Sequence, residues 1–178
     1  MSTSTGVSRG ALTHQYPTKE SLIVAVAEQL LDEIRHIPSS KTGPKPNGEE
    51  GYLEWLLLFT SGRFFDTAEG RALTEIFQAM RTDQSLSDRL ADQVAAWDAV
   101  IEAWYLRRLK AEGGDAELRD FVRLFVFVGR GMLVSGPKED HAAREAIVRA
   151  LAALATPRIR RRPEAEREKM DVAPIERG

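Results

Sequence analysis

Apolar residues recur every three or four positions along most of this chain, which is the spacing of one face of an α-helix. Between the first two such stretches, residues 38–48 hold three prolines and two glycines, which leave no helical register. We therefore expect an all-α protein. The predicted helices cover residues 19–37, 49–66, 68–81, 84–111, 115–135 and 139–155.

The first predicted helix has a clear beginning and a regular apolar side. A threonine at position 18 suits its N-cap, because the side-chain oxygen of threonine accepts a hydrogen bond from a free backbone N–H. The apolar residues then follow at intervals of four, and we expect them to face inward: Leu22, Val26, Leu30 and Ile34.

The helix predicted over 115–135 is apolar on nearly all sides at positions 124–128. Taken alone, its segment "RLFVFVG" also suits a β-strand, since valine and phenylalanine favour strands. We predict a helix because the apolar pattern already begins at Leu118 and Phe121, and because the sequence offers no partner strand.

A helix that is apolar all round must be covered on several sides, and one small domain has few elements able to do this. We therefore expect residues 118–134 and 142–154 to pair with a second copy of the chain in a twofold four-helix interface. The expected homodimer contacts are Phe121, Phe125, Val128, Met132, Ile147 and Leu151.

The amino-acid composition excludes several classes of function. The formal net charge of the 178 residues is −2, so any nucleic-acid binding must come from a local patch. The absence of cysteine excludes disulfides, thiol catalysis and thiolate metal sites. Because no signal-peptide pattern and no apolar run near the roughly 20 residues of a membrane span occurs, we expect a cytoplasmic protein without membrane contact.

Catalytic chemistry has little support in the sequence. No glycine-rich phosphate loop is present, since the "GRG" at 129–131 falls inside a predicted helix. The three histidines do not pair with one another or with carboxylates at metal-ligand spacing. We expect no enzyme activity, no cofactor and no metal site.

The chain opens with "GVSRGALTHQYPTKESL", residues 6–22, which has the form of a turn, a short polar helix, a proline turn and a long helix. The outer face of the short helix is rich in donors, as a reader of the DNA major groove requires. There Arg9 can donate to guanine and Gly10 lets the backbone approach, while Thr13, His14 and Lys19 can reach phosphate oxygens.

This stretch resembles the recognition helix and the following helix start of TetR-type transcriptional repressors, whose usual pattern is close to G-V-S-x-G-x-L-Y-x-H-F-x-S-K-E-x-L. The directly matching residues are Gly6, Val7, Ser8, Gly10, Leu12, Lys19, Glu20 and Leu22. Thr13 departs from the pattern, because many members carry a phosphate-binding tyrosine there. The resemblance implies a homodimer on a palindromic double-stranded DNA operator, contacted through Ser8, Arg9, Gly10, Thr13, His14, Tyr16 and Lys19.

In that family two helices precede the recognition helix, whereas five residues precede Gly6. Without those helices Val7, Leu12 and Tyr16 lose the surface they would bury, at about 1.5–3 kcal/mol for each large apolar side chain. Either the chain is a shortened reading of a longer protein, or it has lost specific DNA binding. The intact motif favours the shortened reading.

The resemblance also implies a cavity for a small-molecule inducer among the later helices. Aromatic and methionine side chains at helical spacing are equally what an ordinary helical core uses, so core remains the alternative for each of them. The candidate pocket residues are Phe64, Phe77, Met80, Trp97, Trp104 and Tyr105.

The expected organisation is a partial helix-turn-helix over 1–37, a helical ligand-binding and dimerisation domain over 49–155, and a disordered tail over 156–178. The "RIRRR" of the tail is followed at once by "EAERE", so we expect a solvated segment and not a nucleic-acid arm. The predicted function is a ligand-responsive repressor. The alternative is a dimeric helical ligand-binding or interaction protein without DNA binding.

Overall fold

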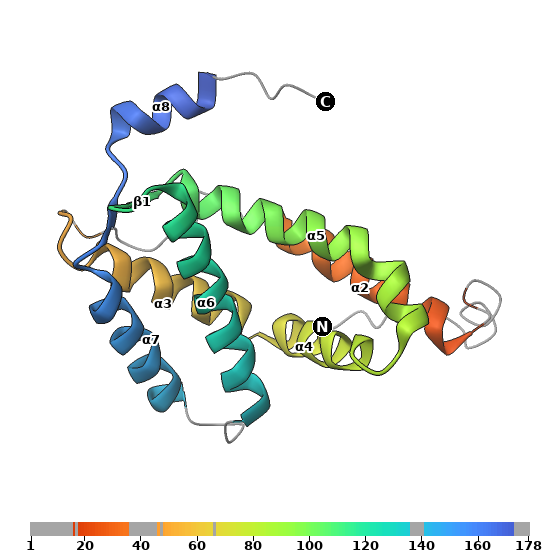
Figure 1. The fold of residues 1–178 in the computed structure, drawn as a ribbon. Coiled ribbons are helices and arrows are strands. Elements are labelled where there is room, and N and C mark those ends of the chain that lie inside the picture. Colours follow the sequence, from red (N-terminus) through yellow and green to blue (C-terminus); the bar gives the residue numbers. More distant parts are fainter. Residues whose placement is uncertain are drawn as a thin grey trace, which may run out of the picture.

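The computed structural model describes residues 16, 18–35, 46, 48–65, 67–135 and 141–172 (Figure 1). These residues form seven helices and one two-stranded sheet, and the predicted all-α class is confirmed. In chain order the elements are α2 (Lys19–Arg35), α3 (Tyr52–Phe64), α4 (Ala68–Met80), α5 (Gln84–Leu106), β1 (Leu109–Ala111), α6 (Asp115–Ser135), α7 (His141–Ala155), β2 (Ile159–Arg161) and α8 (Glu164–Val172).

Short polar side chains fix where several helices begin. The Thr67 hydroxyl accepts from the backbone N–H of Gly70 at 3.1 Å at the start of α4, and the Asp83 carboxylate accepts from Leu86 at 3.0 Å at the start of α5. Each cap satisfies one of the N–H groups that a first helical turn leaves free.

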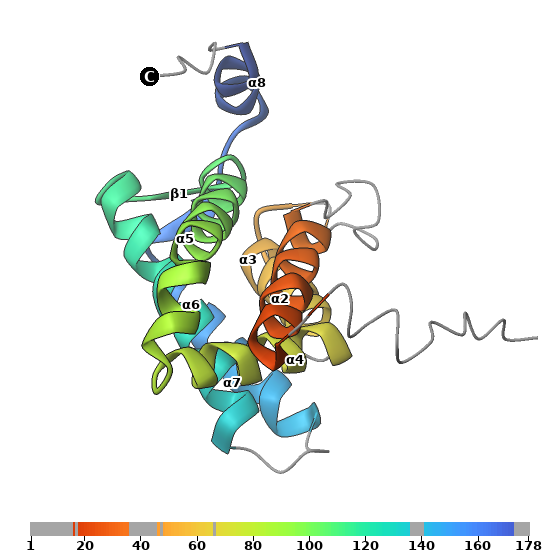
Figure 2. The same ribbon diagram turned by 90° about the vertical axis from the view of Figure 1, so that its right-hand side faces the viewer.

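Two hydrophobic clusters hold the helices together. The larger joins α3, α5, α6, α7 and both strands, and Leu56, Leu118 and Val148 are fully enclosed in it. The smaller lies between α2, α4 and α5 and contains Leu86 and Leu90. The long helices α2 and α5 consequently run side by side (Figures 1 and 2).

The predicted inward face of the first helix needs correction. Leu30 packs against both clusters as predicted, but Leu22 and Val26 are exposed, and α2 buries Val24, Ala27 and Leu31. The side chain of Ile34 lies outside the described residues. A step of four residues turns about 40° beyond a full helical turn, so residues spaced strictly by four wind around the helix. Steps of three and four, as in the buried set, stay on one side.

The long helix ends at Leu106 and not at Ala111, because residues 109–111 form β1 and pair antiparallel with β2. The expectation that the chain offers no partner strand, and that residues 156–172 are disordered, is therefore wrong; 173–178 lie outside the described residues. Ile159 is buried and pairs with Ala111 in the sheet, so one apolar residue among the arginines anchors the segment.

Candidate functional site

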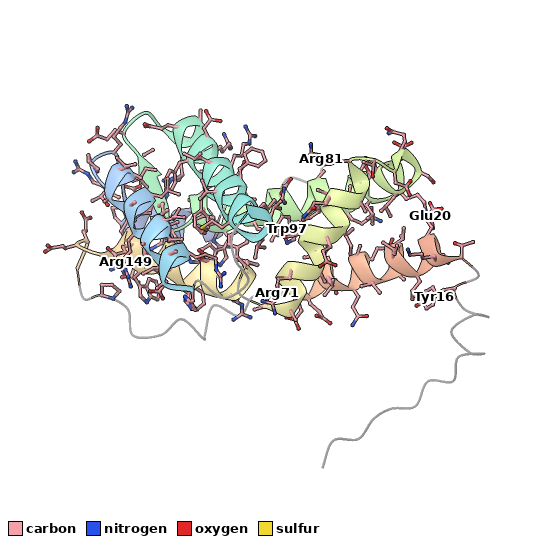
Figure 3. All side chains as sticks on the ribbon, turned by 90° about the horizontal axis from the view of Figure 1, so that it is seen from below. Tyr16, Glu20, Arg71, Arg81, Trp97 and Arg149 are labelled. Carbon is pink, nitrogen blue, oxygen red and sulfur yellow. The ribbon has the colours of Figure 1, made fainter. Side chains whose placement is uncertain are left out.

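The predicted DNA-contacting residues lie mostly at the beginning of the chain. Ser8, Arg9, Gly10, Thr13 and His14 lie outside the described residues. Tyr16 is half-buried just before α2 (Figure 3). Lys19 is the exposed first residue of that helix.

The start of α2 is closed by a reciprocal pair of hydrogen bonds. Thr18 Oγ1 accepts from the backbone N–H of Ser21 at 3.0 Å, and Ser21 Oγ accepts from the N–H of Thr18 at 3.2 Å. The predicted capping role of Thr18 is confirmed. The two bonds satisfy two backbone N–H groups at the start of α2.

Polar contacts also tie α2 to α5 along one side. Glu20 Oε1 accepts from the Ser85 hydroxyl at 2.8 Å and pairs with Arg89 at 3.5 Å. About two turns further along α2, the Glu28 carboxylate accepts from Gln93 Nε2 at 3.0 Å. These groups are exposed and contribute little to stability individually, but they define the register between the two helices.

Two of the predicted pocket residues lie beside a half-buried arginine, Arg130, that the sequence analysis missed. The rings of Phe77 and Trp97 lie 6.0 Å apart, and the Arg130 guanidinium carbon stands 4.3 Å from the first centroid and 5.4 Å from the second. Trp97 therefore sits where α4, α5 and α6 meet (Figure 3). The only sequence signal for Arg130 is a charge inside an otherwise apolar run.

The other four pocket residues are split between the two cores. Phe64, Trp104 and Tyr105 belong to the larger cluster, whereas Met80 packs against the smaller one. Trp104 is covered by the Arg108 guanidinium at 3.8 Å and meets Tyr105 edge-on at 5.0 Å.

Two indole N–H groups of this region are buried without a hydrogen-bond acceptor among the described residues. They belong to Trp97 and Trp104, two turns apart on α5. Buried polar groups are nearly always paired in folded proteins, so each unpaired donor needs an explanation. A bound small molecule with hydrogen-bond acceptors would explain both unpaired donors.

The hydroxyl of Tyr105 is already hydrogen-bonded within the protein. Thr60 Oγ1 donates to the carbonyl of Leu56 at 2.8 Å, so the 2.7 Å contact between the two hydroxyls has Tyr105 as its donor. Burial raises the pKa of the Tyr105 hydroxyl, which keeps the phenol protonated in this role.

We expect Thr60→Val to cost more stability than Tyr105→Phe. The first leaves a buried phenol without a partner, at about 1–3 kcal/mol, whereas the second removes one hydrogen bond, at about 1 kcal/mol. The free energies of unfolding from chemical denaturation test this, with the double variant expected to lose less than the sum. A larger loss for Tyr105→Phe would contradict the assigned donor direction.

A groove of about 380 Å³ runs along the outer side of α5 and α6. Its floor is apolar, with Phe127 65% exposed at one edge, and its polar groups are Asp98, Glu102, Arg123 and Arg130. Burial raises the pKa of Asp98, although the charges of Arg130 and Arg123 act against that shift.

The predicted interface residues of α6 need correction. Phe121, Phe125 and Met132 are buried within the chain, and Val128 packs against the same core. On α7, Leu151 also packs against this core, whereas Ile147 is exposed. When a helix is apolar on all sides, its sequence does not show which side packs against the core of its own chain.

The exposed apolar side of these two helices shares only Ile147 with the predicted set, and we call it the α6–α7 face. Figures 1 and 3 show α6 and α7 next to each other at one side of the molecule. Phe127 and Leu154 are the most exposed of the set, at 65% and 80%. The α6–α7 face consists of Leu124, Phe127, Val134, Ile147 and Leu154.

No family model matches the chain, and no curated protein matches it in sequence. Among solved structures, the chain is similar to Salmonella enterica GusR, with a TM-score of 0.55 and 18% sequence identity. The match covers 84% of this chain and 77% of GusR. The described residues thus share an all-α fold with GusR.

None of the described helices combines the length and the apolar character needed to cross a membrane.

Proposed function

We propose that this protein is a DNA-binding transcriptional regulator, acting as a ligand-responsive repressor and as a homodimer. The observation that carries the proposal is the junction at residues 16–21. A stretch resembling a TetR-type recognition helix leads directly into a capped helix of a TetR-like fold. Similarity to GusR, a structure with a regulator's fold, supports the same role.

In this proposal Arg9 reads a guanine edge, while Ser8, Thr13, His14, Tyr16 and Lys19 hold phosphates and Gly10 permits close approach. Lys19 is well suited to such a contact, because its exposed ammonium stands in the first turn of α2 beside free backbone N–H groups. The dimer forms through the α6–α7 face, which is the largest set of exposed apolar side chains on neighbouring helices among the described residues.

The proposed inducer is a small molecule with hydrogen-bond acceptors that reach the indole N–H groups of Trp97 and Trp104. Both indoles stand on α5, which is tied to α2 through Glu20 and Glu28. Movement of α5 on binding would be passed to α2 and would change the separation of two recognition helices in a dimer.

Selection from a pool of random DNA duplexes tests this function. We expect enrichment of an inverted repeat, with an affinity that falls steeply as salt is raised. Lys19→Gln should weaken binding to all sequences alike and lower the salt slope by about 1. Lys110→Gln is the matched control, because its ammonium is paired with Glu166 at 3.0 Å. A dimer that enriches no sequence at low salt would overturn the proposal and support a helical ligand-binding or interaction protein.

A further inference from the structure

The C-terminal segment forms a pocket with the start of α3, away from the features used above. The pocket has a volume of about 350 Å³ and lies between the loop before α3 and the turn from β2 into α8. Figure 1 shows α8 leaving the body of the molecule beside β1. Three arginines line this arginine pocket, together with Glu49 and Glu164: Arg161, Arg162 and Arg167.

Arg162 is a structural residue that holds the pocket in shape. Its Nε–H is shared between the carbonyls of Leu106 at 2.8 Å and Leu109 at 3.1 Å. Its terminal nitrogens pair with Asp115 at 3.1 Å and Glu166 at 3.4 Å. With its donors and its charge satisfied, Arg162 fixes the first turn of α8 against the body.

The other two arginines could each accept a further anionic partner. Arg167 Nε is buried without a hydrogen-bond partner among the described residues. Within the part of the chain that the structure describes, its one ion pair is with Glu164 at 3.7 Å, and that carboxylate is 80% exposed to water. Arg161 lies over the ring of the buried Tyr52 at 4.9 Å, and no described carboxylate is within ion-pair distance of it.

A further positive charge, that of Arg108, lies near Tyr52. Arg108 has a backbone carbonyl as its hydrogen-bond partner and no ion pair with a described carboxylate. Burial lowers the pKa of the Arg108 guanidinium, and the nearby charges of Arg107 and Arg167 add to that lowering. The first turn of α3, whose N-cap Gly51 provides no side-chain acceptor, adds the positive end of a helix dipole.

We propose that the arginine pocket is a binding site for the phosphate group of a small phosphorylated molecule. A phosphate dianion offers several acceptor oxygens in the geometry that a guanidinium fork matches. It would take up the free Nε–H of Arg167 and the unpaired charge of Arg161, displacing the exposed Glu164 carboxylate. The site lies apart from the proposed DNA and dimer surfaces and does not depend on them.

Titration of the full chain with inorganic phosphate at constant ionic strength tests the site by calorimetry. We expect saturable binding of one phosphate per chain, with a dissociation constant of about 1 mM or tighter. Arg161→Gln and Arg167→Gln should each weaken it at least about fivefold, which is about 1 kcal/mol. Arg149→Gln is the matched control, because that guanidinium is paired with Glu54 and Glu145 at the α3–α7 surface.

Two further variants separate a built site from a general charge effect. Arg167→Lys keeps the charge but removes the Nε donor, and we expect it to weaken binding without lowering the melting temperature. Glu164→Gln should tighten binding, because it removes the carboxylate that competes for Arg167, whereas Glu145→Gln should not. Absence of saturable binding, or equal effects of Glu164→Gln and Glu145→Gln, would overturn the proposal. Comparison with acetate at equal concentration tests whether any small oxyanion suffices, and equal affinity would likewise overturn the phosphate assignment.

Discussion

Phe127→Glu is expected to convert the proposed dimer into monomers. Phe127 is 65% exposed in the single chain, and burying a side chain of this size contributes about 1.5–3 kcal/mol. In a twofold dimer the substitution occurs in both chains, so that contribution is lost twice. It also places two carboxylates in an apolar contact. We expect the dissociation constant of the dimer to rise at least about a hundredfold, which corresponds to about 2.8 kcal/mol. Sedimentation equilibrium over a series of protein concentrations measures this shift.

The control for this variant is Val100→Glu, which adds the same charge to an exposed apolar residue of α5 outside the α6–α7 face. It should leave the dimer intact. If the two variants weakened association equally, or if neither did, the α6–α7 face would not be the dimer contact.

Gly129→Ala is expected to destabilise the fold by about 2–3 kcal/mol, the upper part of the range for overpacked cores. A Cβ at this position of α6 would overlap ring carbons Cε2 and Cζ of Phe65. That ring is buried at the end of α3 and packs edge-on against Phe125 at 6.0 Å, so it has no room to retreat. The melting temperature should fall by about 5–10 °C for a chain of this size.

Gly62→Ala is the matched control, since it makes the same change on the exposed side of α3, with nothing within 4 Å of the added Cβ. There alanine should be neutral or stabilising by about 0.5–1 kcal/mol, because it restricts the unfolded chain. Phe65→Leu should recover part of the loss in the Gly129→Ala background. Equal melting temperatures for Gly129→Ala and Gly62→Ala would contradict the close packing of α6 on α3.

The sequence predicted the helices better than it predicted their orientation. The helix over 115–135 is confirmed at both ends, because its apolar residues form an unbroken pattern between a glycine pair and a glycine–proline dipeptide in the sequence. Spacing alone could not tell which side of it faces the chain's own core. Phe125 and Phe127 are both phenylalanines on one helix, yet the first is buried and the second is 65% exposed.

The C-terminal segment was predicted least well. Its high charge is typical of a disordered tail, but the charges are paired across long sequence separations, as Arg160 is with Glu112 and Arg162 with Asp115. Composition counts charges and cannot show where each one finds its partner. For the same reason the unpaired donors of Arg167 and Trp97 become apparent only in the folded chain.

The most direct test of a dimeric DNA-binding regulator is the mass of the complex that the chain forms with its selected duplex, measured by native mass spectrometry. We predict two chains on each inverted repeat, adding twice the 19.9 kDa of one chain, and loss of that complex for Phe127→Glu. A single chain on each duplex, or a chain that selects no duplex at all, would contradict this account.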